Sequence, residues 1–324
     1  MRRRAFLGLV GGAATWPLTV RAQQPAMPVI GYLRSDSFDG AQHQLSGFRQ
    51  GLKETGFIEG QNVAIEFRSA EGHRDRLPTL VAEFIRRPVA VIVGNGIAAQ
   101  AAKAATQTVP IVFGFGGDPV REGLVTSIGR PDGNVTGVTF LVSSVSAKRL
   151  ELLHELVPGA AVIAALLDLN NMPGESEMRD VEAAARSLGR ELVIARTTAG
   201  QGFEEAFAMF AQRRAGALYV GAGPSLAAQR ARIVALAARH ALPAVHPIRQ
   251  FVEIGGLMSY GASQVDAYHQ IGRYAGNILK GVKPSDLPVV QASTFELVLN
   301  LKTAKALGLR VPQNLQVAAT DVIE

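Results

Sequence analysis

Residues 89–115, VAVIVGNGIAAQAAKAATQTVPIVFGF, decide the fold. Within this stretch, Val89–Val93 is a continuous apolar run, which is typical of a strand buried on both faces of a parallel sheet. The alanine-rich segment Ala98–Thr106 predicts a helix, and Ile111–Phe115 predicts the next strand. A strand, a helix and another strand in this order indicate a parallel α/β sheet.

The same alternation extends on both sides of this stretch. Further strands are expected at Val29–Leu33, Val63–Phe67, Val135–Phe140, Ala161–Leu167, Glu191–Ala195, Leu218–Val220, Leu257–Tyr260 and Phe295–Leu299. Further helices are expected at Ala41–Thr55, Leu77–Arg86, Ser146–Leu156, Ser176–Leu188, Phe203–Arg213, Leu226–His240, Ala267–Leu279 and Leu301–Leu307. Because the pattern begins again after residue 156, we expect two doubly wound parallel-sheet lobes. Ligands of such folds bind beyond the carboxyl ends of the strands and in clefts between domains.

Composition and charge exclude several classes of protein. Hydrophobic residues make up 48% of the 324 residues and charged residues 19%, which indicates a globular chain. Basic residues exceed acidic ones by six. Four of the basic residues are the arginines at positions 2, 3, 4 and 21, so the excess falls to two if residues 1–22 are removed. Without a dense basic run, no nucleic-acid partner is expected. The chain has no cysteine, so disulfides and cysteine-based metal sites are excluded.

The first 22 residues are expected to be a signal peptide. Arg2–Arg4 form a positive start, an apolar stretch follows, and Val20-Arg21-Ala22 precedes a possible cleavage site. The sequence RRRAFL is similar to a twin-arginine signal, and an ordinary Sec signal is the alternative. The segment is too short and too interrupted for a membrane anchor. We therefore expect export and a soluble mature protein in the periplasm.

Several longer stretches resemble one known family. They include GLKETGFIEGQNVAIEFR, AAKAATQTVPIVF, GDPVREGLVTSIGRPDGNVTGV, KRLELLHELVPG, FVEIGGLMSYG and FELVLNLKTAKALGL. Together they resemble the TrpX-like substrate-binding proteins of ABC transporters, from about Pro28 to Glu324. The resemblance implies a type I periplasmic-binding fold, with two lobes joined by a three-crossover hinge that closes on the ligand.

The resemblance also implies an organisation and a function. Crossovers are expected near Phe140–Ser143, Tyr260–Ser263 and Val290–Phe295. Lobe one would then comprise 28–141 and 262–290, and lobe two 142–261 and 291–324. The implied function is binding of a small, amino-acid-like or aromatic ligand in the interlobe cleft by a monomer without cofactors, which docks transiently on an ABC permease of the inner membrane. A ligand sensor for a membrane receptor is the alternative with the same fold.

In lobe one, three strand ends carry candidate ligand contacts. Arg34 could pair with a carboxylate, whereas Ser35 and Asp36 could contact ligand or cap the next helix. Gly94-Asn95-Gly96 would expose backbone N–H groups beside a helix N-terminus, which favours an anion. Relatives often carry a Thr/Ser-rich turn at that place, so Asn95 is a departure. Phe115 could stack on the ligand.

Two carboxylates are candidates for a cationic group of the ligand. Asp118 could meet an ammonium or stabilise the turn before Pro119. In lobe two, Asp168, Asn170 and Asn171 follow an apolar strand and could reach the cleft. Two more candidates of lobe two are Gly223, in a small loop after a strand, and Tyr260, which could stack on ligand or fix the hinge. Gly94–Gly96 and Arg34 would hold an anionic end of the ligand.

No catalytic or metal site is expected. The six histidines are scattered without a metal-binding spacing, and neither HExxH nor GxSxG occurs. A periplasmic enzyme is therefore the weakest of the functional hypotheses.

Overall fold

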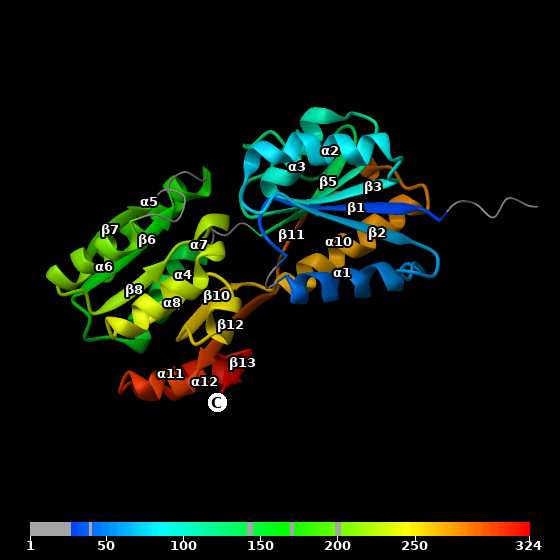
Figure 1. The fold of residues 1–324 in the computed structure, drawn as a ribbon. Helices are drawn as coiled ribbons and strands as arrows, with labels where there is room; N and C mark the ends of the chain where they lie inside the picture. Colours follow the sequence, from blue (N-terminus) through cyan, green and yellow to red (C-terminus); the bar gives the residue numbers. More distant parts are fainter. Residues whose placement is uncertain (1–26, 39–40, 141–144, 169–171, 198–201) are drawn as a thin grey trace, which may run out of the picture.

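The computed structural model describes residues 27–38, 41–140, 145–168, 172–197 and 202–324. It consists of two α/β halves, and each half has a central sheet with helices on both faces (Figure 1). The expected signal peptide, residues 1–22, lies outside the described residues. The expectation of two mainly parallel α/β lobes is confirmed.

The first half is built on a six-stranded sheet in the order β11-β5-β4-β3-β1-β2, and all its strand pairs are parallel. Its strands are β1 Val29–Arg34, β2 Ala64–Ser69, β3 Val91–Asn95, β4 Ile111–Phe115, β5 Val135–Thr139 and β11 Val290–Gln291. Helices α2 Leu77–Arg86 and α3 Gly96–Ala105 cover one face of the sheet, and α1 Gln42–Glu54 and α10 Gln264–Leu279 cover the other (Figure 1). Apolar side chains therefore bury both faces of its central strands.

Helices α1 and α10 approach each other closely because glycines face each other where they cross. A Cβ atom on Gly51 would overlap the backbone oxygen of His269. In the same way, a Cβ on Gly272 would overlap the backbone oxygen of Phe48. This contact joins a helix from the start of the chain to one that begins more than 200 residues later. The close packing holds the two helices in a fixed relative position. Gln44 on α1 and Gln264 on α10 both line the cavity between the halves.

The second half is built on a seven-stranded sheet in the order β13-β12-β10-β9-β8-β6-β7. Its strands are β6 Val162–Asp168, β7 Glu191–Thr197, β8 Ala217–Val220, β9 Ala244–His246, β10 Met258–Ala262, β12 Phe295–Asn300 and β13 Asp321–Ile323. Its helices are α4 Ser146–Leu156, α5 Met172–Ser187, α6 Phe203–Gln212, α7 Pro224–Ala228, α8 Arg230–Arg239, α9 Gln250–Glu253, α11 Leu301–Ala306 and α12 Gln313–Ala318. One apolar cluster packs α4, α5, α11 and α12 against the sheet, and another packs α6 and α8 against its opposite face.

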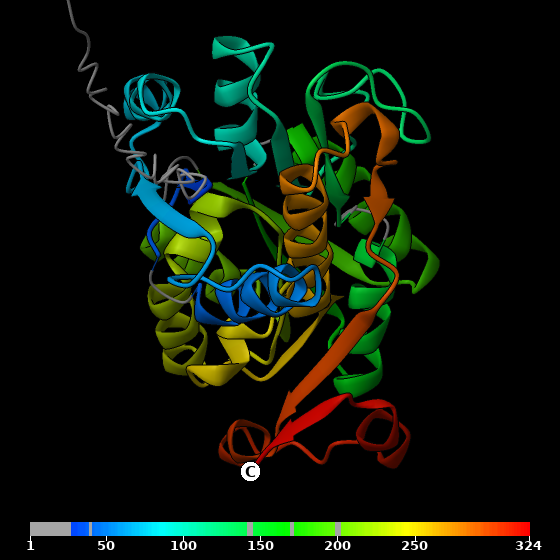
Figure 2. The ribbon, with the colours of Figure 1, turned by 90° about the vertical axis from the view of Figure 1, so that its right-hand side faces the viewer.

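Two strands of the second sheet depart from the expected parallel order, because β12 and its parallel neighbour β13 both run opposite to the other strands. Strand β12 pairs antiparallel with β10, so that Ala262 lies opposite Phe295 and Met258 opposite Leu299. The reason is topological, because the chain enters β12 from the first half, at the edge where β10 ends. A strand that starts at this edge can only run back along its neighbour. Figure 2 shows β12 extending away from the first half toward the C-terminus.

The chain passes between the two halves three times. The passages lie between β5 and α4, between β10 and α10, and between β11 and β12. Residues 141–144 of the first passage are outside the described residues. The lobe limits given above stay a prediction. Within the described part of the chain, no helix has both the length and the apolar character that a membrane span requires.

Three sequence expectations are corrected. Gly94–Gly96 was expected to lie between a strand ending at Val93 and a helix beginning at Ala98, but β3 continues to Asn95 and α3 begins at Gly96, so no loop separates them. The expected helix 226–240 is divided at Gln229 into α7 and α8. Ser35 and Asp36 do not cap α1, whose N-cap is Ala41 and has no side-chain cap.

Candidate functional site

The carboxyl ends of several strands in the two sheets face one cavity. In the first sheet, the parallel register aligns Leu33 with Gly94, Asn95 with Gly114, and Phe115 with Thr139. This alignment brings Arg34, Asn95 and Phe115 to one edge. In the second half, the segments after β8 and β9 contribute Ala222, Gly223, Pro247 and Ile248 to the same cavity.

The cavity encloses about 230 Å³ and is lined from both halves. Apolar groups form much of its wall, among them Ile97, Phe115, Phe140, Pro247 and Ile248. The polar lining residues are Arg34, Ser35, Asp36, Gln44, Asn95, Arg230, Gln250, Gln264 and Tyr268. A largely apolar cleft with a few fixed polar groups is the usual form of a small-molecule site.

Arg34 is the last residue of β1, is 5% exposed, and is held in place by several acceptors. Its Nη2 donates to Oδ2 of Asp36 at 2.7 Å, and its Nε donates to the Ser37 carbonyl oxygen at 3.2 Å. The other carboxylate oxygen of Asp36 accepts from Nδ2 of Asn95 at 2.8 Å. Oδ1 of Asn95 in turn accepts from the Ser35 backbone N–H at 3.0 Å. The strand ends of β1 and β3 are thus tied into one polar cluster.

A chain of side-chain hydrogen bonds leads from Arg34 to the second half. Its Nη1 donates to Oε1 of Gln44, and Nε2 of Gln44 donates to Oε1 of Gln264. Nε2 of Gln250, on α9, donates to the same Gln264 oxygen at 3.4 Å. Because a guanidinium can only donate, Arg34 determines which way each amide in the chain is oriented. This series of hydrogen bonds spans the second passage, where β10 of the second half leads into α10 of the first.

Two guanidinium groups give the cavity a positive character. Burial by itself would lower the pKa of Arg34, but Coulombic interactions with Tyr268 and Asp36 outweigh it and raise this pKa above its ordinary value. Arg34 therefore stays charged at any physiological pH. Arg230 contributes a second guanidinium from α8, and its Nη1 donates to the Ala227 carbonyl oxygen at 3.1 Å.

A buried ion pair supports the cavity wall of the second half. Arg149 and Glu177 have side chains that are 0% and 2% exposed, and Nη1 of Arg149 lies 3.1 Å from Oε1 of Glu177. Tyr219 donates to the same carboxylate oxygen at 2.7 Å. Oε2 of Glu177 accepts from the Ala222 backbone N–H at 3.0 Å, and Nε of Arg149 donates to the Tyr260 carbonyl oxygen at 2.9 Å. One side-chain cluster therefore fixes both the loop after β8 and strand β10, which leads into the second passage.

His246 lies directly before the lining residues Pro247 and Ile248. It ends β9, is fully buried, and stacks on Phe251 with ring centroids 4.6 Å apart. Neither of its ring nitrogens has a hydrogen-bond partner among the described residues. Burial, together with the charge of Arg149, lowers the pKa of His246 to about 3. The ring is therefore neutral at neutral pH and serves as a packing surface.

The structure places the residues predicted from the sequence in two groups. Those that line the cavity are Arg34, Ser35, Asp36, Asn95, Gly96, Phe115 and Gly223. Those outside the lining are Gly94, Asp118, Asp168 and Tyr260. Asn170 and Asn171 lie outside the described residues. Contact of any of them with a ligand stays a prediction.

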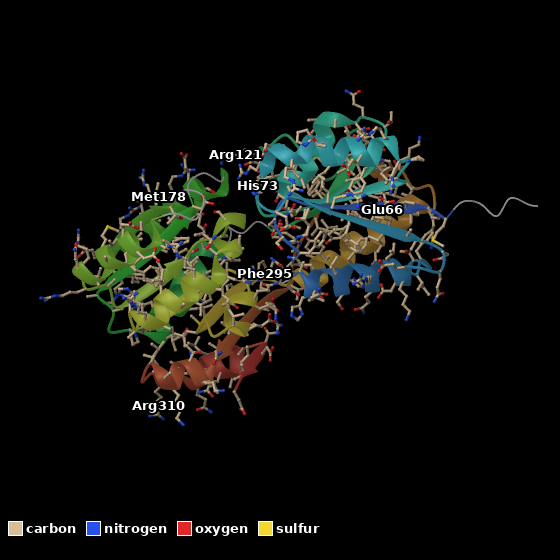
Figure 3. The ribbon with its side chains drawn as sticks, viewed as in Figure 1. Glu66, His73, Arg121, Met178, Phe295 and Arg310 are labelled. Atoms are coloured by element: carbon tan, nitrogen blue, oxygen red, sulfur yellow. The ribbon has the colours of Figure 1, made fainter. Side chains whose placement is uncertain are left out.

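Three of the predicted residues outside the lining have a partner within the protein. Oδ1 of Asp118 accepts from the backbone N–H groups of Val120 and Arg121, which is the turn role considered above. Asp168 is 3% exposed and accepts from the Ser225 hydroxyl. Tyr260 stacks on Phe295, with ring centroids 6.1 Å apart, and Phe295 lies where the two halves meet (Figure 3).

Other lining residues were not predicted from the sequence. They lie on helices, whereas the rule for parallel sheets points only to the segments that follow strands; they are Gln44, Arg230, Gln250, Gln264 and Tyr268. A signal existed for Gln44, because it is a buried polar residue on the otherwise apolar face of α1. Ring contacts also matter, since Phe140 and Tyr268 stack with centroids 6.4 Å apart.

Metal ligation has no support in the described part of the chain, where no three His, Asp or Glu side chains lie close enough to hold an ion. What the site offers is a fixed guanidinium, backbone N–H groups and apolar walls. These groups can bind an organic anion.

A model of the ABC transporter substrate binding protein family matches residues 29–323. The chain belongs to this family. It is 25% identical over 265 residues to the tyrosine-binding protein of Clostridioides difficile strain R20291, which covers 82% of this chain and 76% of that protein.

Solved structures agree with this assignment. The structure of an ABC domain in complex with L-Trp from Streptococcus pneumonia has a TM-score of 0.83, is 26% identical, and covers 91% of this chain and 99% of the other. A leucine-binding protein from Thermotoga maritima has a TM-score of 0.54 at 15% identity and covers 76% and 80%, which shows the fold alone. The chain is a substrate-binding protein of an ABC transporter and not an enzyme.

Proposed function

We propose that the chain binds a small aromatic or amino-acid-like ligand in the cavity between its two halves. The observation that carries this proposal is that the buried guanidinium of Arg34 lies in a largely apolar cavity lined from both halves. Apolar walls favour a flat hydrocarbon body, whereas the guanidinium favours a carboxylate through paired hydrogen bonds. The relatives named for tyrosine and bound to L-Trp support this class of ligand.

In this proposal, Arg34 and the N-terminus of α3 at Gly96 hold the anionic end of the ligand. Backbone N–H groups at a helix start are partial positive charges that favour an anion. Asn95 does not cap α3, because its side chain is bonded to Ser35 and Asp36 instead. Phe115 and Phe140 would contact the apolar body of the ligand.

The proposal includes a cellular setting. Residues 1–22 direct export by the twin-arginine route, and the mature chain begins near Gln23 in the periplasm, where a transient contact delivers the ligand to the permease. N-terminal sequencing of the protein from an osmotic-shock fraction tests this. An intact Met1 in the cytoplasmic fraction would show that the segment is not a signal.

A thermal-shift screen of the mature chain tests the ligand class. The panel contains amino acids, aromatic acids, purines and sugars. A true ligand at 100 times its dissociation constant stabilises the folded state by about 2.7 kcal/mol. We expect the response among aromatic acids or amino acids. A response confined to sugars or purines would contradict the proposal.

A further inference from the structure

The charges around the cavity bear on one feature of the ligand that the family leaves open. Among the lining residues that the structure describes, Asp36 is the one carboxylate, whereas Arg34 and Arg230 are both cationic. An α-amino acid carries an ammonium as well as a carboxylate. The question is therefore whether any group in the cavity can receive that ammonium.

Asp36 is already used by the protein. One of its carboxylate oxygens accepts from Arg34 at 2.7 Å and the other from Asn95 at 2.8 Å. These bonds fix the guanidinium that faces the cavity and join the ends of β1 and β3. An ammonium placed on Asp36 would compete with Arg34 for the same carboxylate and would lie beside a like charge.

The two other carboxylates considered for this role lie outside the lining, and each is bonded to a residue of its own half. Asp118 is exposed and holds its own turn through the N–H groups of Val120 and Arg121. Asp168 is buried and accepts from Ser225. A charged group that leaves water without a counter-charge carries a large desolvation cost.

We propose that the ligand is an aromatic or apolar carboxylate without an ammonium group, held by Arg34 inside a cavity of net positive charge. This inference rests on the proposed function and makes it more specific. A carboxylate gains from both guanidinium groups, and the apolar walls accept the remainder of the ligand. The α-ammonium of an amino acid would be repelled by the same charges that attract its carboxylate.

Matched pairs of ligands test the inference, because the members of each pair differ only in the α-ammonium. The pairs are indole-3-propionate with L-tryptophan, and 3-(4-hydroxyphenyl)propionate with L-tyrosine. Tryptamine, which has the ammonium but no carboxylate, is the third arm. Calorimetric titration of the mature chain should give about tenfold tighter binding for the acid without an amino group, or ~1.4 kcal/mol, in each pair that binds. Tryptamine should not bind.

Two protein variants separate the possible roles of the carboxylates. Asp118→Asn and Asp168→Asn should leave the affinity for indole-3-propionate within about twofold, a difference of ~0.4 kcal/mol. An affinity for L-tryptophan equal to or tighter than that for indole-3-propionate would overturn the inference and leave the proposed function standing. Failure of every member of both pairs to bind, with a response to sugars or purines in the thermal-shift screen, would overturn both.

Discussion

Lowering the pH should destabilise the fold through one histidine behind the cavity wall. His246 is buried against Phe251 without a hydrogen-bond partner among the described residues, and its pKa is lowered to about 3 from an ordinary 6.5. The folded state therefore excludes a proton that the unfolded chain accepts. Stability contributed by neutral His246 is fully present above the unfolded pKa of 6.5 and is lost as the pH falls toward 3.

The magnitude at a given pH follows from how far that pH lies below the unfolded pKa of 6.5, as long as it stays above the folded pKa of about 3. Each pH unit below the unfolded pKa costs ~1.4 kcal/mol, so that the loss at pH 5 amounts to about 2 kcal/mol relative to pH 8. A typical domain has only about 5–15 kcal/mol of total stability, so this change is measurable. Arg149 acts in the same direction as burial, because its charge further disfavours an imidazolium.

The assay compares urea unfolding of the wild type and of His246→Leu at pH 8 and pH 5. Leucine has a similar volume and does not titrate, so any packing cost of the substitution is the same at both pH values. Titration of the carboxylates also cancels in the comparison. The wild type should lose about 2 kcal/mol more than the variant between the two pH values. Equal losses would contradict this prediction and show that folding does not lower the pKa of His246.

Three further pairs of substitutions test the packing and the site. Gly51→Ala should lower the free energy of unfolding by about 1–3 kcal/mol, because its Cβ would overlap the His269 backbone. Gly129→Ala is the control: residue 129 faces open space, so the change should be less than about 0.5 kcal/mol. Urea titration measures both. Arg149→Met should cost about 3–5 kcal/mol because Glu177 stays buried without its cation, and an effect no larger than that of the exposed Arg310→Met would contradict this in the same assay. Gly96→Val should weaken ligand binding about tenfold, because its side chain would meet the ring of Phe115. Asn95→Ala should weaken binding less, because the backbone N–H groups survive. Calorimetry with the tightest ligand of the thermal-shift screen measures both, and the reverse order would count against α3 as the anion site.

Local pattern was sufficient for most of the regular elements. Leu77–Arg86, Ile111–Phe115 and Ser146–Leu156 have the same bounds in the structure as in the sequence expectation. In the two helices the spacing of apolar residues agrees with the burial that tertiary packing imposes, and in the strand the continuous apolar run does so. Strand β9 was missed because three residues, Ala244–His246, are too few to show a period. The antiparallel direction of β12 was missed because it depends on the edge at which the chain enters the second sheet.

The candidate site was predictable only where it consists of strand ends. Arg34, Asn95 and Phe115 follow from the rule that ligands bind beyond the carboxyl ends of parallel strands. Gln250, Arg230 and Tyr268 reach the cavity from helices, and their positions depend on how the halves pack. The turn role of Asp118 could be considered from the sequence, because its partners Val120 and Arg121 follow it directly in the chain. The bond between Asp168 and Ser225 could not, because it joins residues far apart in the sequence. Local sequence reveals the type of a side chain but not the partner that it finds.

Calorimetric titration of Arg34→Met tests the central claim most directly. The matched control is Arg310→Met, because Arg310 is exposed and lies at the far edge of the second half, away from the cavity (Figure 3). With the tightest ligand of the thermal-shift screen, the wild type and Arg310→Met should bind one ligand per chain with equal affinity. Arg34→Met, verified as folded by circular dichroism, should bind at least about 30-fold more weakly, a loss of ~2 kcal/mol. Undiminished affinity in Arg34→Met would contradict a binding site in the cavity between the two halves.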